Sequence, residues 1–138
     1  MTRPVARLHS TVLDCPDPDL LARFYQELLG YQVHHSDDGW VSIADPADRS
    51  PRLSFQRVDN YQAPTWPQGR RPQQFHLDLL VDDLVAAHDG ALAAGASPLA
   101  GVVLHEDEKF QVYADPAGHP FCLIQQANPE PTGPAPTG

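Results

Sequence analysis

The sequence has little positive charge and no long apolar run, and each shortage excludes a class of protein. Its 138 residues carry 9 Lys and Arg against 18 Asp and Glu, which gives a formal net charge of −9. That balance argues against nucleic acid or an anionic membrane as a partner. No stretch of about 18 apolar residues offers a membrane span. The first ten residues, MTRPVARLHS, also lack the apolar centre of a signal peptide. We therefore expect a cytoplasmic protein.

Cysteine is scarce as well. The two cysteines, Cys15 and Cys122, stand far apart and match no metal-binding or redox spacing, so we interpret both as buried free thiols. A nucleophile elbow, a P-loop and a dinucleotide fingerprint are also missing. The last stretch, NPEPTGPAPTG, has no aliphatic residue larger than alanine, which predicts a disordered tail at residues 129–138.

What is present begins with a strand and a helix. Residues 6–14, ARLHSTVLD, alternate as a strand does. A helix follows, in which Asp17 is the expected N-cap, Pro18 suits the first turn and Gly30 is the expected stop. Three strand candidates come next, namely YQVHHS, GWVSIA and RLSFQRV. The predicted order is β-α-β-β-β.

The same order then repeats. A strand, QFHLDLLV, leads into a helix with Asp82 as the expected cap and Gly95 as the expected stop. Strand candidates follow in SPLAGVVLH, KFQVYA and PFCLIQQ. Three correspondences support a duplication: His9 with His76, Gly30 with Gly95, and Ala44-Asp45-Pro46 with Ala114-Asp115-Pro116.

The duplication predicts one domain over residues 1–128. Its modules span about residues 6–58 and 74–126, and a linker of residues 59–73 joins them. The linker is rich in proline and glycine and contains Tyr61 and Trp66. Two interpretations of it stay open: a plain connection whose aromatic rings rest on the surface, or the lid or wall of a cavity.

This pattern resembles the vicinal oxygen chelate superfamily, in its glyoxalase-like branch. The resemblance rests on DPDLLARFYQELLG, Gly39-Trp40, LSFQRV, Trp66-Pro67, QQFHLDLLVDDL, Gly95-Ala96 and DPAGHPFCLI. It implies an α+β fold of two tandem βαβββ modules, which form a curved mixed-sheet half-barrel around a central cavity, often in a homodimer. The superfamily includes glyoxalases, dioxygenases and bleomycin-resistance binding proteins, so the fold leaves the function open.

The resemblance also implies where a metal would bind. Metal-using members take His, Gln or Glu from the first and last strands of each module. The first strands supply His9 and His76, which are suitable ligands. The last-strand positions hold Ser54 and Cys122, which are poor support for a four-coordinate site. We therefore favour no metal. If a divalent metal (Zn, Ni, Mn or Fe) is present, the expected ligands are His9, His76, Gln56 and Gln125.

The remaining histidines share no spacing, so we expect solvated or capping roles for His34, His35, His88, His105 and His119. The His76–Asp78 spacing on one strand face allows a histidine supported by a carboxylate. Without a metal, the cavity would be a ligand pocket lined by aromatic and apolar side chains. The predicted ligand-binding residues are His9, Trp40, Phe55, Tyr61, Trp66, His76, Phe110 and Cys122, and Tyr113 is a further candidate for the lining.

Our leading hypothesis is a metal-independent binding protein that sequesters a hydrophobic or aromatic small molecule, such as an antibiotic. The alternative is a divalent-metal-dependent lyase, isomerase or dioxygenase, and a vestigial pocket in an interaction protein stays open as a third. No catalytic residue follows from the sequence, which also leaves open the identity of the ligand and the strand register at Ser54 and Cys122.

Overall fold

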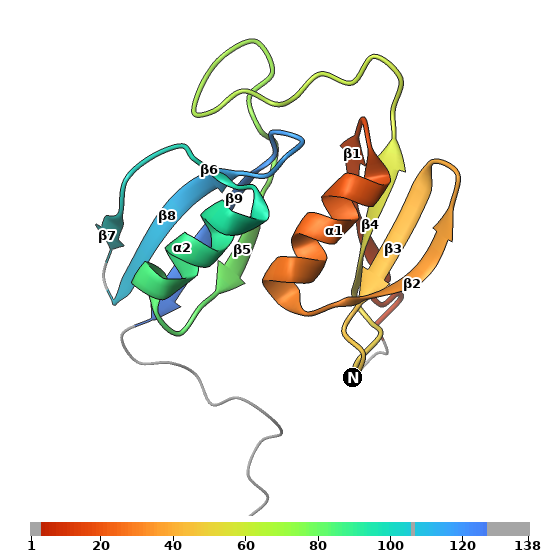
Figure 1. Cartoon of the computed structure of the whole chain (residues 1–138), viewed down its shortest axis with the longest axis horizontal. Helices are drawn as coiled ribbons and strands as arrows, with labels where there is room; N and C mark the ends of the chain where they lie inside the picture. The colour runs from red at the N-terminus through yellow and green to blue at the C-terminus, as the bar shows by residue number, and fades with distance from the viewer. Residues whose placement is uncertain (1–3, 106, 127–138) are drawn as a thin grey trace, which may run out of the picture.

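The computed structural model describes residues 4–105 and 107–126. The first module contains β1 (Ser10–Cys15), α1 (Pro18–Leu29), β2 (Gln32–Asp37), β3 (Trp40–Ala44) and β4 (Arg52–Arg57). The second contains β5 (Leu77–Leu80), α2 (Leu84–Ala94), β6 (Ser97–Pro98), β7 (Val103–His105), β8 (Glu108–Ala114) and β9 (Pro120–Gln126). The predicted α+β fold of two repeated modules is confirmed, and the modules lie side by side with the linker looping beyond them (Figure 1).

The predicted tail, residues 129–138, lies outside the described residues. Among the helices that are described, none has the length and apolar composition needed to cross a membrane. The stretch predicted as one strand, SPLAGVVLH, contains two short strands, β6 and β7, which both pair with β8.

Each module forms its own open sheet. The strand orders are β1-β4-β3-β2 and β5-β9-β8-β6, with β7 also on β8. The first strand of each module pairs in parallel with the last: β1 with β4, and β5 with β9. As a result, β1 and β5 are edge strands, and the two modules expose equivalent edges.

The helix ends follow local chemistry. Asp17 caps α1 by accepting a hydrogen bond from the Leu20 amide at 3.2 Å, and Gly30 ends the helix in the left-handed region at φ 72°. The cap of α2 is Asp83, whose carboxylate accepts from the Val85 amide at 3.0 Å. The prediction of Asp82 was therefore wrong by one residue, because Asp83 is the extended residue directly before the first helical turn.

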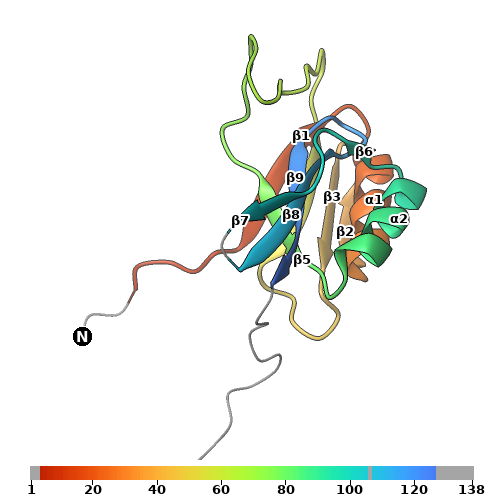
Figure 2. The same ribbon diagram turned by 90° about the vertical axis from the view of Figure 1, so that its left-hand side faces the viewer.

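Side chains alternate between two faces in each sheet. In β4, Leu53 and Phe55 belong to the apolar core under α1, whereas Ser54 points to the opposite side. Both helices cover the same side of the molecule (Figure 2). We call the face of each sheet turned away from its helix the open face.

The core joins the two modules through aromatic rings. Tyr25 on α1 is fully buried, stacks on Phe55 at a centroid distance of 5.7 Å and meets Phe121 of the second module edge-on at 6.2 Å. Its hydroxyl donates a hydrogen bond of 2.7 Å to the carboxylate of Asp115, which lies between β8 and β9. The same carboxylate accepts from the backbone amides of Ala117 and His119. A buried polar contact therefore ties the first helix to the last turn.

We predict that Tyr25→Phe lowers the free energy of unfolding by about 1–3 kcal/mol, because the buried Asp115 carboxylate loses a donor. Urea unfolding at neutral pH would measure this. Tyr31→Phe is the matched control, since the described residues offer no hydrogen bond to the Tyr31 hydroxyl, and it should change stability by less than about 0.5 kcal/mol. Equal stability of the two variants would show that the contact across the modules contributes nothing.

Candidate functional site

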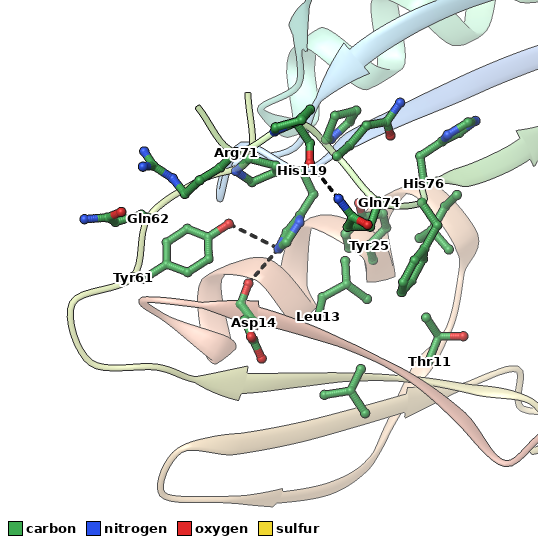
Figure 3. Close-up of a pocket in the computed structure, with 17 residues that line it drawn as sticks. Thr11, Leu13, Asp14, Tyr25, Tyr61, Gln62, Arg71, Gln74, His76 and His119 are labelled. Carbon is green, nitrogen blue, oxygen red and sulfur yellow. Dashed lines mark hydrogen bonds between the residues drawn. The ribbon is translucent and has the colours of Figure 1, made fainter. Parts of the chain in front are cut away.

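A cavity of about 390 Å³ lies between the edges of the two modules. Its walls come from β1, from the start of β5, from the linker and from the turn before β9 (Figure 3). The lining includes the apolar side chains of Val12, Leu13, Phe75 and Leu77. A volume of this size falls within the usual range of small-molecule pockets, and apolar walls with a few polar groups are typical of them.

The linker forms one wall of this cavity. It supplies the lining residues Tyr61, Gln62, Pro64, Arg71, Pro72 and Gln73. The Tyr61 hydroxyl donates to the Ala117 carbonyl at 2.8 Å, which fastens the linker to the second module. Of the two interpretations that the sequence left open, this geometry favours a cavity wall.

His119 lies between the modules and borders the cavity. Its Nε2 atom is 2.6 Å from the backbone carbonyl oxygen of Asp14 and 3.2 Å from the Tyr61 hydroxyl (Figure 3). A carbonyl oxygen only accepts hydrogen bonds, so Nε2 carries a proton and donates a hydrogen bond to the backbone carbonyl of Asp14. The expectation of a solvated or capping histidine was wrong, because this ring bridges the second module to β1.

Buried hydroxyls beside the cavity hold their protons firmly. Burial raises the pKa of Tyr61, and the charge of Asp115 adds to the rise. Burial also raises the pKa of Tyr25 well above its ordinary value, again with Asp115 as the next cause. Near neutral pH both groups are hydrogen-bond donors and neither is a base.

The strand register changes the predicted match between the modules. Ser54 pairs with Ser42, two residues before the first Ala-Asp-Pro turn, and Cys122 pairs with Val112, two residues before the second. These two positions therefore correspond, as expected. On the neighbouring strands, Val12 pairs with Ser54 and Asp78 with Cys122.

Counting two residues back from Val12 and Asp78 places Ser10, not His9, in the position of His76. His9 precedes β1, is exposed and receives a hydrogen bond from the Arg52 guanidinium at 3.3 Å. The match of His9 with His76 was wrong by one residue. Such a slip turns a side chain to the other face of a strand.

The first module therefore has no ligand set for the metal that the resemblance implies. At the corresponding positions it presents the hydroxyls of Ser10 and Ser54, which lie 2.6 Å apart and bond to each other. Serine is a rare zinc ligand, and Val12 beside them offers no donor atom. The residues do not fit a four-ligand site that spans both modules.

The second module does bring together groups of ligand type. The ligand atoms of His76, Asp78 and Cys122 all lie within 4.8 Å of one another. His76 Nε2 is 3.0 Å from Asp78 Oδ1, as the spacing of two residues predicts. Burial raises the pKa of the Cys122 thiol to about 11, with the Asp78 carboxylate as the next cause. Cys122 is therefore a neutral thiol at physiological pH.

The two glutamines considered as metal ligands lie apart from this group. Gln125 Oε1 accepts from the Leu84 amide at 2.8 Å, so this side chain faces α2 and not the open face, and the prediction for Gln125 was wrong. Gln56 is exposed on the open face of the first module, where it pairs with Asp14 and Trp40.

Of the predicted ligand-binding residues, only Tyr61 and His76 line the cavity. Phe55 and Tyr113 are fully buried in the core, so their predicted places in the lining were wrong. Trp40 is half-buried and donates from Nε1 to Ser42 at 2.9 Å. Trp66 lies half-buried in the linker and Phe110 half-buried on β8.

Five of the residues that line the cavity were not predicted from the sequence, namely Thr11, Asp14, Tyr25, Gln73 and His119. Tyr25 sits in the helical pattern as an ordinary core residue, and no spacing singles out His119. One signal was available: both modules expose an edge strand, and the linker that joins them must pass near those edges.

The comparisons with known proteins agree with this fold. The model of a family described as Glyoxalase-like domain matches residues 10–124. No curated protein matches the chain. A glyoxalase/bleomycin resistance protein/dioxygenase family enzyme from Burkholderia phytofirmans has a TM-score of 0.69 at 17% identity, over 88% of this chain and 99% of its own.

Two further solved structures are similar. A glyoxalase-related enzyme from Fulvimarina pelagi gives a TM-score of 0.67 at 20% identity, over 88% of this chain and 89% of its own. A glyoxalase/bleomycin resistance protein/dioxygenase from Nocardioides gives a TM-score of 0.63 at 14% identity, over 99% of this chain and 92% of its own. At these identities the likeness concerns the fold.

We predict that both cysteines of the native protein resist alkylation. Burial raises the pKa of Cys15, like that of Cys122, to about 11 from 9.0, so the reactive thiolate is about 100-fold rarer near neutral pH than in an ordinary thiol. Mass spectrometry after iodoacetamide treatment at pH 7.5, with and without urea, would measure the rates. If native Cys122 reacts as fast as it does in urea, it is an accessible nucleophile and not a buried neutral thiol.

Proposed function

The chain belongs to the Glyoxalase-like domain family, and from that premise we propose that it binds a hydrophobic or aromatic small molecule in the cavity under the linker, without a metal. The observation that carries the proposal is the cavity itself, which has a volume of about 390 Å³ and walls from both modules. The first module has no set of metal-ligating side chains at the corresponding strand positions, which supports binding without a metal.

The lining suits a flat, largely apolar ligand. Tyr61, Tyr25 and Phe75 contribute aromatic rings, and proline and aliphatic side chains fill much of the remaining wall. Aromatic contacts contribute about 0.5–1.5 kcal/mol each beyond the burial of area. Polar side chains, among them Thr11, Gln73 and His119, are available to orient such a ligand.

The existing bonds of the polar groups support sequestration over catalysis. The His119 Nε2–H, the Tyr61 hydroxyl and the Tyr25 hydroxyl are each engaged in bonds that hold the modules together. A group that stabilises the fold in this way is a poor candidate for proton transfer to a ligand. Antibiotics with aromatic rings are one class of compound that this cavity would accommodate.

The second candidate is a divalent-metal-dependent lyase, isomerase or dioxygenase. One observation favours it, the convergence of His76, Asp78 and Cys122. Those residues come from the second module alone. The homodimer expected from the resemblance is a further proposal, which sedimentation analysis would test.

We predict that Val12→Trp blocks the cavity. Val12 lines it and is 41% exposed, so a larger ring at this position occupies the ligand's space without disturbing the core. The uncharged fluorescent probe N-phenyl-1-naphthylamine should bind the native protein. Its affinity for Val12→Trp should be lower by at least about tenfold, equivalent to about 1.4 kcal/mol.

Val33→Trp is the matched control for that experiment. Val33 is 50% exposed on β2, outside the cavity, and its replacement should leave probe binding unchanged. Equal probe binding by both variants would place the probe elsewhere and remove the cavity from the proposal.

We also predict that EDTA leaves probe affinity unchanged, because no described cavity contact requires a cation. Elemental analysis of protein purified without chelator would accompany the titration. One result would contradict binding without a metal and favour the metal-dependent enzyme. It is a near-stoichiometric content of Zn, Ni, Mn or Fe that is lost in His76→Ala but retained in His34→Ala.

A further inference from the structure

Four side chains form a hydrogen-bonded chain across the open face of the first module. The indole Nε1–H of Trp40 donates to Ser42 Oγ at 2.9 Å. Ser42 Oγ is 2.8 Å from Ser54 Oγ, which is 2.6 Å from Ser10 Oγ. The chain therefore runs through three strands, from β3 through β4 to β1.

The direction of this chain follows from its first member. An indole N–H only donates, so Ser42 accepts from Trp40 and has its own proton left to give. Ser42 is 6% and Ser54 1% exposed, and among the described residues the hydroxyl partner for the Ser42 proton is Ser54. By the same reasoning Ser54 donates to Ser10. The proton of Ser10 remains available, and donors in series strengthen one another.

Arg52 lies beside that available proton. It is the strand partner of Ser10, so both side chains leave the sheet on the open face, and both are half-buried. Its Nη1 donates to His9 Nε2 at 3.3 Å, which makes that nitrogen an acceptor, and its Nε donates to the Arg49 carbonyl oxygen at 3.2 Å. The carboxylate would therefore approach the Nη side of the guanidinium. Within residues 4–105 and 107–126, Arg52 forms no ion pair with a carboxylate.

An arginine with no carboxylate partner in the described part of the chain is notable in a protein whose formal net charge is −9. The pKa of His34 lies below its ordinary value through partial desolvation and then the positive charges of Arg52 and Arg49, so positive potential gathers at this end of the sheet. The carboxylates of the nearby loop form hydrogen bonds within that loop. Asp45 accepts a hydrogen bond from the Ala47 amide, and Asp48 accepts one from the Ser50 amide.

We propose that the Ser10 hydroxyl and the Arg52 guanidinium form a binding site for a carboxylate on the open face of the first module. A guanidinium matches the planar pair of carboxylate oxygens, and a hydroxyl at the end of a donor chain adds a directed hydrogen bond. Neither residue lines the cavity under the linker, so the site stands independently of the proposed function.

The strand register relates this site to the equivalent position in the second module. Ser10 stands in the first module where His76 stands in the second, the position at which the resemblance leads one to expect a metal ligand. In this protein, Ser10 offers a hydrogen-bond donor at that position, beside Arg52. The first module is thus suited to hold an anion where a cation site would have required acceptors.

Benzoate is the probe that tests the site, with the indole N–H signal of Trp40 in NMR spectra as the reporter. Trp66→Phe leaves a single indole signal and assigns it. Benzoate should shift this signal, because a new acceptor at Ser10 polarises the whole chain. Ser10→Ala and Arg52→Gln should each weaken benzoate binding about tenfold, the size expected for a charge-assisted hydrogen bond.

Four further variants make the test specific. Ser54→Ala interrupts the chain, so benzoate should still bind, as backbone amide shifts near Arg52 report, while the Trp40 signal no longer moves. Ser36→Ala on β2 and Arg57→Gln on β4 are controls that should bind as the native protein does. Arg52→Lys should recover part of the affinity lost in Arg52→Gln.

The proposal fails if benzoate leaves the Trp40 signal unmoved at tens of millimolar. It also fails if Ser10→Ala binds benzoate as tightly as Ser36→Ala does, or if Arg57→Gln weakens binding as much as Arg52→Gln. Thermal melting of each variant would confirm that the fold persists. None of these readouts depends on the probe that tests the cavity.

Discussion

The buried carboxylate of Asp115 is the constraint on which the rest of the structure depends. It accepts hydrogen bonds from the Tyr25 hydroxyl on α1 and from two amides of its own turn. That turn then offers His119 to the backbone of β1 and the Ala117 carbonyl to Tyr61 of the linker. One turn of the second module therefore fastens a helix, an edge strand and the linker.

The cavity is a consequence of this fastening. The described strands of the two sheets do not pair with each other, and β1 and β5 are both edge strands. The turn that contains His119 joins β1 to the second module, and the fastened linker closes one side of the space between them. Because burial raises the pKa values of Tyr25 and Tyr61, both phenol groups stay protonated near neutral pH. They hold walls together and are ill suited to act as bases.

Much of the fold could be predicted from the sequence because its signals are local and occur twice. The alternation of strands, the capping aspartate of α1 and the two glycine stops each identify an element by its own chemistry, and the repeat then orders the elements. The caps show the limit of this reasoning, since Asp82 and Asp83 are adjacent and chemically alike. Only the backbone conformation distinguishes them.

The site was harder to predict, since it depends on register and on contacts between modules. A slip of one residue exchanged His9 for Ser10, and with it a metal ligand for a proton donor. Phe55 looked available as a strand aromatic, but its parity in β4 turns it into the core. His119 meets Asp14 across 105 positions of sequence, and no local pattern predicts such a contact.

The central claim is that the turn around His119 locks the second module onto β1, and the tautomer of His119 tests it most directly. Long-range ¹H–¹⁵N NMR spectra of protein labelled at histidine nitrogens report which ring nitrogen carries the proton. The structure predicts a proton on Nε2, because the Asp14 carbonyl oxygen 2.6 Å away only accepts. A ring protonated at Nδ1 alone, or signals averaged between the two tautomers, would contradict it.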